Sequence, residues 1–309
     1  MSKRILSIIL SAVLVSVLLL AGCSSAGAET TTDTGQASAI CITDMMGRTV
    51  ALEKPAEKVV VLTASACEIV YALGAGDTII GRGEYCDWPV EALAKPSLAS
   101  GSETNIEQII ALRPDLVLMA TMDQTPEQVE QIQKAGIAVY SSEAHTIAST
   151  YESILQIGTL MGKDAEAQQI VGSMKATFEA LAAHKVTGTV YFEVSPLENG
   201  LWAAGNNTFL NEVAELIGLE NIFADVDSWA EVSEEQVLKR NPDYIVTLCM
   251  YYGTGLTPVE EILQRASWQN VAAVKNARVF NLSNNELARP APRLAEGTQA
   301  LYEFIKANS

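Results

Sequence analysis

The sequence predicts an α/β protein of two lobes, each built on a mostly parallel sheet and joined to the other by one long α-helix. Three observations predict this fold class. The middle of the chain contains a long amphipathic segment, a motif is repeated on either side of it, and short apolar stretches alternate with helical ones elsewhere. Strands that alternate with helices form parallel sheets whose two faces are covered by those helices.

The amphipathic segment, residues 164–185, predicts the helix that connects the lobes. Its apolar residues recur at steps of three, four and seven, which places them on one face of a helix. They are Ala167, Ile170, Val171, Met174, Phe178 and Leu181. A helix of about 20 residues is roughly 30 Å long, the width of a small domain, so we expect it to pack on both lobes. The alternative is an ordinary surface helix within one domain.

The repeated motif comprises residues 105–118 and 233–246. Each copy predicts a capped short helix, a Pro-Asp turn and a buried strand. A Thr-Pro pair that starts another helix follows each copy, at residues 125–126 and 257–258. Because the same unit occurs on both sides of the connecting helix, the sequence indicates two similar lobes.

The first residues predict export. Lys3 and Arg4 precede an apolar run, and a small-residue site then leads to Cys23. We interpret residues 1–22 as a lipoprotein signal peptide and Cys23 as the lipid-bearing residue. An uncleaved membrane helix is the alternative, but the apolar run is short for a bilayer span. The protein is therefore expected outside the cytoplasm, lipid-anchored to the cell membrane.

The remaining residues divide into four predicted parts. Residues 23–38 are rich in Ser, Thr, Gly and Ala and predict a flexible tether. An N-terminal α/β lobe is expected over residues 39–150, a connecting helical segment over 151–186, and a C-terminal α/β lobe over 187–309.

Charge and composition disfavour two classes of partner. The formal charge is −17 and becomes −19 once the two basic residues of the signal peptide are removed, which disfavours nucleic acid. The chain has two histidines and no Cys-x-x-Cys pair, so we expect no metal site and no receptor for a bare zinc or manganese ion. Cys41, Cys67, Cys86 and Cys249 allow three disulfide pairings, and free buried thiols are the preferred interpretation.

The candidate ligand-binding residues lie at the carboxyl ends of the predicted strands, where open parallel sheets hold their ligands. They are Thr63, Ser65, Arg82, Tyr85, Tyr251, Tyr252, Asn285 and Arg289, together with Trp202 and Trp229 from loops. Aromatic side chains bury large areas, so this set suits a large, flat or apolar ligand. Some of these aromatic side chains can instead belong to the core. For three other aromatic residues, Tyr71, Trp88 and Trp268, a core position is the preferred interpretation.

The candidate residues argue against an enzyme. Ser65 lies between a strand and a helix, but its surroundings, TASAC, lack the Gly-x-Ser-x-Gly pattern of hydrolases. Neither His145 nor His184 lies in a loop that clearly meets Ser65. We therefore expect no catalytic residue and no cofactor. An exported, lipid-anchored hydrolase is the distant alternative, and loss of ester or glycoside turnover in Ser65→Ala would favour it.

Glu107 and Glu235 occupy the same place in the two copies of the repeat. A carboxylate in the first turn stabilises a helix N-terminus, so each residue can serve as part of a cap. Two matched carboxylates, one per lobe, can also dock on the basic pockets of a two-fold partner. The residues alone favour the cap.

Five stretches match a known family: TDMMGRTVAL, VVVLTASACEIVYALGAGDTIIGRGEYCDWP, TNIEQIIALRPDLVLMA, EVSEEQVLKRNPDYIV and ARPAPRLAEG. Through them the mature chain resembles the substrate-binding lipoproteins of ABC importers for cobalamin and iron chelates. The resemblance implies a ligand held between two lobes, delivery to a membrane permease and no catalysis. It also implies that Glu107 and Glu235 are docking residues that form salt bridges with permease arginines, which replaces the cap as the interpretation.

The same resemblance bears on the ligand. Tyr85, Trp229 and Arg289 coincide with the Tyr, Trp and Arg that contact cobalamin in the cobalamin-binding members of the class. Gly101 and Ala120 stand about where those members have tryptophans.

Asn285 stands where the cobalamin-binding members have an acid, and this is a departure from their pattern. A ferric siderophore or haem is therefore kept as the alternative ligand. A tris-catecholate chelate carries several negative charges and calls for a cluster of arginines. Only Arg82 and Arg289 are expected in the cleft, so the sequence favours cobalamin or a related corrinoid.

Overall fold

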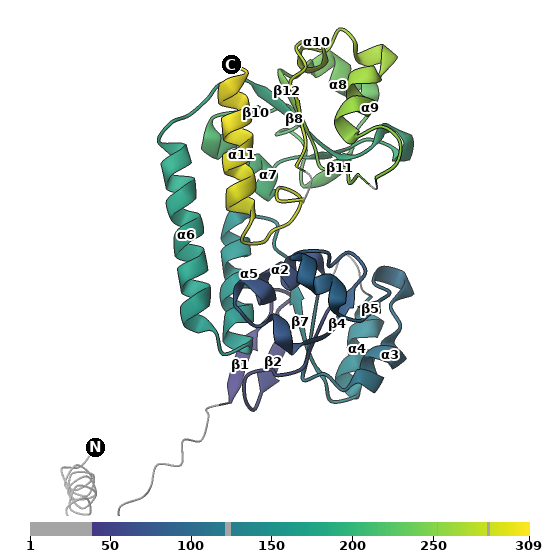
Figure 1. The fold of residues 1–309 in the computed structure, drawn as a ribbon, viewed down its shortest axis with the longest axis vertical. Coiled ribbons are helices and arrows are strands. Elements are labelled where there is room, and N and C mark those ends of the chain that lie inside the picture. The colour runs from purple at the N-terminus through teal and green to yellow at the C-terminus, as the bar shows by residue number, and fades with distance from the viewer. Residues whose placement is uncertain (1–38, 121–124, 252, 283–284) are drawn as a thin grey trace, which may run out of the picture. The chain divides into compact units, whose positions relative to one another are not determined.

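The computed structural model describes residues 39–120, 125–251, 253–282 and 285–309. The predicted signal peptide, the predicted tether with Cys23, and Tyr252 lie outside the described residues. Within the described residues, the expected α/β fold of two lobes joined by one long helix is confirmed (Figure 1). None of the helices in these ranges has the length and apolarity needed to cross a bilayer.

The N-terminal lobe is built on a five-stranded sheet in which every neighbouring pair is parallel. In sheet order the strands are β5 (Ser97–Leu98), β4 (Ile79–Gly83), β3 (Val59–Val61), β6 (Leu116–Ala120) and β7 (Ala138–Ser142). The helices of this lobe are α2 (Ala64–Ala72), α3 (Ile106–Leu112), α4 (Pro126–Lys134) and α5 (Ile147–Leu160), and short 3₁₀ turns are η1 (Gly76–Thr78), η2 (Val90–Ala94) and η3 (Gly101–Glu103). A two-stranded hairpin precedes the sheet and consists of β1 (Ile40–Thr43) and β2 (Thr49–Leu52). The central strand β3 is buried throughout, as expected for a strand covered on both faces.

The C-terminal lobe is built on a six-stranded sheet with a mixed edge. Its main path runs through β11 (Trp229–Glu231), β9 (Trp202–Ala204), β8 (Thr189–Ser195), β12 (Tyr244–Thr247) and β13 (Val279–Phe280), and β10 (Glu220–Asn221) pairs with β8. The helices are α7 (Phe209–Ile217), α8 (Glu234–Arg240), α9 (Pro258–Gln264), α10 (Ala272–Lys275) and α11 (Leu294–Ala307), with 3₁₀ turns η4 (Leu197–Asn199) and η5 (Ala266–Trp268).

The antiparallel strands β9 and β11 correct the expectation that Trp202 and Trp229 lie in loops. Each strand has three residues, which is too short for an alternating apolar pattern to be visible in the sequence. The other strands of this sheet, β8, β10, β12 and β13, pair in parallel, so the sheet is mostly parallel as predicted.

The sequence repeat is also a structural repeat. In each copy a seven-residue helix, α3 or α8, leads through a Pro-Asp turn into a central strand, β6 or β12. The Asp115 carboxylate accepts a hydrogen bond from the Lys58 amide at 2.9 Å, just before β3. The Asp243 carboxylate accepts one from the Thr189 amide, also at 2.9 Å, at the start of β8. Aspartates at equivalent positions of the repeat therefore bond the Pro-Asp turn to the neighbouring strand in both lobes.

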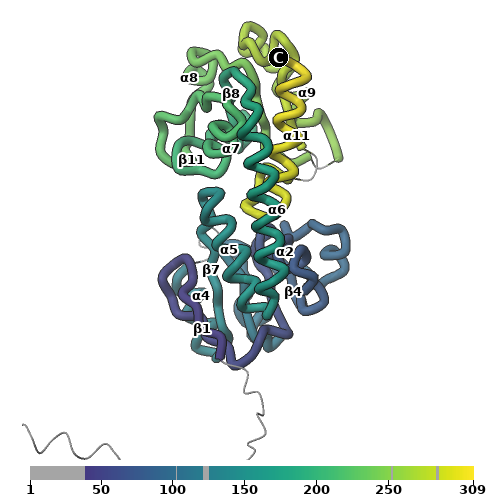
Figure 2. The backbone as a smooth tube through the Cα atoms, turned by 90° about the vertical axis from the view of Figure 1, so that its left-hand side faces the viewer, coloured from purple at the N-terminus to yellow at the C-terminus, as the bar shows by residue number. Residues whose placement is uncertain are grey.

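The connecting helix is α6 (Asp164–Ala182), within the predicted segment. Of the six apolar stripe residues, all are buried except Ile170, which is half-buried. Helix α6 packs on α5 of the N-terminal lobe and on α7 and α11 of the C-terminal lobe (Figure 2). Gly158 of α5 permits close packing, because a Cβ atom there would lie 2.5 Å from that of Ala167 in α6. The helix therefore contacts both lobes and is not an element of one domain.

Candidate functional site

The two lobes meet where the segment before α11 reaches the carboxyl ends of β3 and β4. Arg289, in this segment, is the centre of the contact and is 8% exposed. Its Nη1 atom lies 2.9 Å from Glu68 Oε1 on α2 and 2.7 Å from Asp87 Oδ1. Its Nη2 atom donates to the carbonyl oxygen of Tyr85 at 3.2 Å. One guanidinium group therefore holds α2 and the loop after β4 together.

A second arginine, Arg293, also binds the Glu68 carboxylate. Its Nε atom donates to Glu68 Oε2 at 2.9 Å and its Nη2 atom to Oε1 at 2.6 Å. Its guanidinium also lies 4.3 Å from the centre of the Trp88 ring. Trp88 was expected in the core, but it is 36% exposed, because it serves as a surface on which Arg293 stacks. Trp268 and Tyr71 were also expected in the core. Trp268 is fully buried, as expected, whereas Tyr71 is half-buried.

The two arginines that were expected to face the ligand instead bond groups of this chain. Burial lowers the pKa of Arg289, but its hydrogen bonds with Asp87 and Glu68 outweigh burial and raise that pKa overall. Arg289 therefore stays charged and paired with protein carboxylates. Arg82 is 8% exposed, and its Nη1 atom donates to the carbonyl oxygens of Gly83 at 3.0 Å and Glu84 at 3.2 Å.

The candidate aromatic residues are the part of the site that remains open to solvent. Tyr85 is 55% exposed, Tyr251 is 48% exposed and Trp202 is 40% exposed. Trp229 is half-buried, with its ring edge-on to Phe209 at a centroid distance of 5.5 Å. Exposed aromatic rings of this size offer apolar contact area to a bulky ligand.

The remaining candidates are less distinctive. Thr63 is the N-cap of α2, where its side chain accepts a hydrogen bond from Ala66, and Ser65 is half-buried in the first turn. Asn285 is half-buried and adopts a left-handed backbone conformation with φ of 59°. His145 lies 2.8 Å from Glu143, on the loop after β7.

Two cavities lie on the side of α6. A groove of about 990 Å³ is lined by residues of α6 and α11 and by residues 184–187 between α6 and β8, which include His184. A hollow of about 330 Å³ lies between α2, α6 and the start of α11. Of the candidate ligand-binding residues that the structure describes, none lines either cavity.

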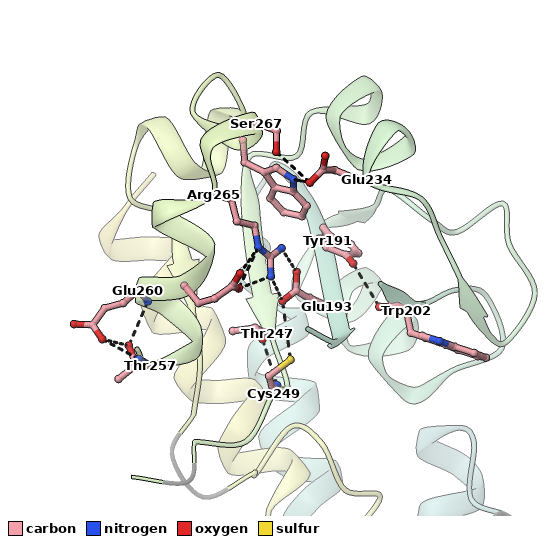
Figure 3. Close-up of polar contacts among 12 residues, drawn as sticks. Tyr191, Glu193, Trp202, Glu234, Thr247, Cys249, Thr257, Glu260, Arg265 and Ser267 are labelled. Carbon is pink, nitrogen blue, oxygen red and sulfur yellow. Dashed lines mark hydrogen bonds and ion pairs between the residues drawn. The ribbon is translucent and has the colours of Figure 1, made fainter. Parts of the chain in front are cut away.

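A buried ion pair that sequence patterns did not reveal lies in the C-terminal lobe (Figure 3). Glu193, at the end of β8, is 1% exposed, and its Oε2 atom lies 2.6 Å from Arg265 Nη1. Burial raises the pKa of Glu193, and the pairing with Arg265 opposes that shift. Arg265 also bonds Glu261 of α9, so the cluster secures α9 and the chain around Cys249 against β8.

The sequence does contain a signal for the other buried ion-pair cluster, the one around Glu68. Glu68 is the one charged residue in an otherwise apolar and small-residue helix, ASACEIVYA. A buried carboxylate requires a charged partner. The partners of Glu68, however, are distant in the sequence: Arg289 lies 221 positions away and Arg293 lies 225 positions away. Sequence spacing alone does not connect them.

Glu107 and Glu235 are exposed in the first turns of α3 and α8. Other side chains make the caps: Asn105 accepts from the Gln108 amide at 3.0 Å, and Ser233 accepts from the Gln236 amide at 3.2 Å. The carboxylates of Glu107 and Glu235 are therefore not the capping groups. They project from equivalent positions of the structural repeat.

Comparison with known proteins identifies the family. A model of the periplasmic binding protein family matches residues 59–286. The chain is 31% identical over 307 residues to the uncharacterized ABC transporter substrate-binding lipoprotein YvrC of Bacillus subtilis, and the match covers 96% of this chain and 95% of that one.

Solved structures share the fold. The periplasmic vitamin B12 binding protein BtuF of Vibrio cholerae superposes with a TM-score of 0.69 at 26% identity, covering 82% of this chain and 98% of that chain. A possible iron-binding, periplasmic solute-binding protein of Staphylococcus epidermidis superposes with a TM-score of 0.65 at 29% identity, covering 82% and 99%. The chain therefore belongs to the periplasmic binding protein family, and it is an extracytoplasmic solute-binding protein and not an enzyme.

Proposed function

We propose that the protein is the lipid-anchored substrate-binding protein of an ABC importer and that it captures a bulky metal chelate, a cobalamin or related corrinoid, for delivery to the permease. The ligand is held between the lobes, against Tyr85, Trp202, Trp229 and Tyr251. Cys23 carries the lipid and residues 23–38 are the tether. Relatives named for vitamin B12 binding and for ABC transport support this proposal.

The observation that carries the choice of ligand is that Arg289, one of the two arginines expected in the site, is paired with carboxylates of this chain. Arg289 is bonded to Glu68 and Asp87, and Arg82 is bonded to backbone carbonyl oxygens. A polyanionic chelate needs guanidinium groups that are free to face it. Cobalamin presents mainly amides and a flat macrocycle, so exposed aromatic rings suit it better. A ferric siderophore or haem is the second candidate, supported by the similarity to the possible iron-binding protein.

Delivery is proposed to use Glu107 and Glu235, one carboxylate from each lobe. Both side chains are exposed, and neither is needed to cap its helix, because Asn105 and Ser233 already do so. Helix α6 packs on both lobes and fixes their separation. A pair of carboxylates at a fixed spacing matches a two-fold permease surface with one basic pocket in each half.

The ligand is tested by titrating the purified chain with cyanocobalamin, cobinamide, a ferric tris-catecholate, a ferric hydroxamate and haemin. A corrinoid at 100 times its dissociation constant is expected to stabilise the fold by about 2.7 kcal/mol, which calorimetry and thermal unfolding both detect. Stabilisation by a ferric chelate or haemin, with no response to either corrinoid, reverses the choice of ligand. No response to any of the five removes the bulky chelate from the proposal.

Variants locate the binding surface. Tyr85→Ala and Trp202→Ala are each expected to weaken corrinoid binding by about 10-fold or more, because each removes an exposed ring from the contact. Met46→Ala is the matched control, since Met46 is a similarly exposed apolar residue, 48% exposed, at the tip of the β1–β2 hairpin. Equal affinities in all three variants would place the ligand elsewhere.

A further inference from the structure

Two buried thiols meet beneath the loop that carries Tyr85. Cys67 lies in α2 and Cys86 in the turn after β4, and both are 0% exposed. The Cys86 thiol donates to the carbonyl oxygen of Val61 at 3.7 Å. Both cysteines are free thiols in this structure, and their side chains lie close enough to affect each other's ionisation. The two sulfur atoms are therefore neighbours in the core of the N-terminal lobe.

The backbone explains why these thiols meet. Strands β3 and β4 run in parallel, with Val61 opposite Arg82, so α2 and the turn after β4 begin at the same edge of the sheet. Gly83 lets the two segments approach, because a Cβ atom there would lie 2.4 Å from the Leu62 carbonyl oxygen. The approach brings Leu62, two residues before α2, against Gly83 at the end of β4.

Contacts of the neighbouring residues hold this arrangement in place. Arg289 bonds Glu68, which follows Cys67, and it also bonds Tyr85 and Asp87, which flank Cys86. One guanidinium group thus clamps both segments on either side of the thiol pair. The contacts of Arg289 therefore hold positions 67 and 86 near each other.

The other two described cysteines are placed differently. Cys41 is exposed in β1 of the hairpin. Cys249 is half-buried in the C-terminal lobe, where its sulfur lies 4.0 Å from Glu193 Oε1. These two cysteines serve as internal controls for the pair.

We propose that Cys67 and Cys86 form a disulfide bond when the exported chain folds. The oxidant is a disulfide, either a small-molecule disulfide or the active-site disulfide of a thiol oxidoreductase, and such oxidants act outside the cytoplasm. One thiolate attacks the oxidant, forms a mixed disulfide and releases one thiol. The second cysteine then attacks its partner's sulfur, which joins Cys67 to Cys86 and releases the second thiol. The oxidant gains the two electrons and the two protons that the cysteines lose.

Burial sets the time at which this exchange takes place. The neighbouring Cys86 thiol and burial raise the pKa of the Cys67 thiol, so the folded protein holds little of its reactive thiolate. Exchange is therefore expected during folding, before the loop closes over the two cysteines. The fold then shields the bond from reductants.

Thiol mapping tests the pairing. The purified chain, with Cys23→Ser to remove the one cysteine outside the described residues, is denatured, reduced and refolded in a mixture of oxidised and reduced glutathione. It is then denatured again, alkylated with N-ethylmaleimide and digested for mass spectrometry. The expected result is alkylation of Cys41 and Cys249 only, with a disulfide-linked peptide pair that contains Cys67 and Cys86. Alkylation of all four cysteines, or a bond that includes Cys41 or Cys249, overturns the proposal.

Two further measurements examine burial and stability. The chain refolded with reductant is expected to keep both thiols reduced when oxidised glutathione is added to the native protein, and rapid oxidation there contradicts the shielding. The oxidised chain is expected to unfold at a temperature several degrees above the reduced one. This difference is expected to persist in Cys41→Ala/Cys249→Ala and to vanish in Cys67→Ala/Cys86→Ala. An identical difference in both double variants refutes the pairing.

Discussion

At the scale of single residues, the carboxylate of Glu68 has the greatest influence on the site. It is 4% exposed and receives hydrogen bonds from Arg289 and Arg293, which arrive from the other end of the chain. Removing one partner of a buried ion pair leaves the others charged and unpaired in a region of low polarity. The loop with Tyr85 is held through the same arginines, so Glu68 supports the candidate site without belonging to it.

The variant Glu68→Ala tests this role. We expect it to lower the free energy of unfolding by roughly 3 kcal/mol, the cost of breaking a buried ion pair. Urea unfolding measures the loss. Glu84→Ala is the matched control, because Glu84 is an exposed glutamate on the neighbouring loop and its replacement is expected to cost less than about 0.5 kcal/mol. Similar losses in the two variants contradict the account.

Tyr85 and Arg289 show how much of the candidate site can be predicted from the sequence. Residue types at strand ends made Tyr85 and Arg289 candidate site residues, and in the structure Arg289 donates to the Tyr85 carbonyl oxygen. The role of Arg289 differs from the expected one, because its charge is matched by carboxylates of this chain. Charge matching depends on which distant segments meet, and this information is absent from local sequence patterns.

At the scale of elements, apolar periodicity was an accurate guide wherever an element was long. The 3.6-residue period predicted α6 and its buried face, and capping pairs predicted α4 and α9. The start of α5 was missed: the helix begins at Ile147, four residues before the predicted segment, because Thr146 and Ser149 form a capping box without the usual Glu or Gln. Strands of two or three residues, such as β5 and β13, have too few side chains to show a period.

The variant Phe178→Ala tests whether α6 is held by its apolar face. Phe178 is 3% exposed and its ring lies 6.5 Å from that of Tyr151 on α5. We expect a loss of about 3–5 kcal/mol, from lost burial and from the cavity left behind. The control is the adjacent Glu179→Ala on the exposed face, for which the expected change is within about 0.5 kcal/mol. Chemical denaturation of both variants gives the comparison, and a small effect of Phe178→Ala means that α6 is held by other contacts.

At the scale of the whole molecule, contacts at three places join the lobes. Helix α6 packs on helices of both lobes, and the arginines before α11 bind Glu68 and the loop after β4. A third contact links the start of α5 to α7, where the Ile147 amide donates to Glu212 Oε2 at 2.6 Å. Contacts at several places along the junction keep the lobes at a defined separation. Surface features of the two lobes can then be recognised together by one partner.

This geometry gives the docking proposal its sharpest test, which uses Glu107→Ala combined with Glu235→Ala. Because both side chains are exposed and other residues cap their helices, the double variant is expected to fold normally and to keep full affinity for its ligand. Uptake of that ligand by cells that carry the permease is expected to be lost, since each lobe loses its charged contact. Glu130→Ala with Glu220→Ala, again one exposed glutamate per lobe, controls for the change in net charge. Undiminished uptake in the first variant, or equal losses in both, removes the docking role from Glu107 and Glu235.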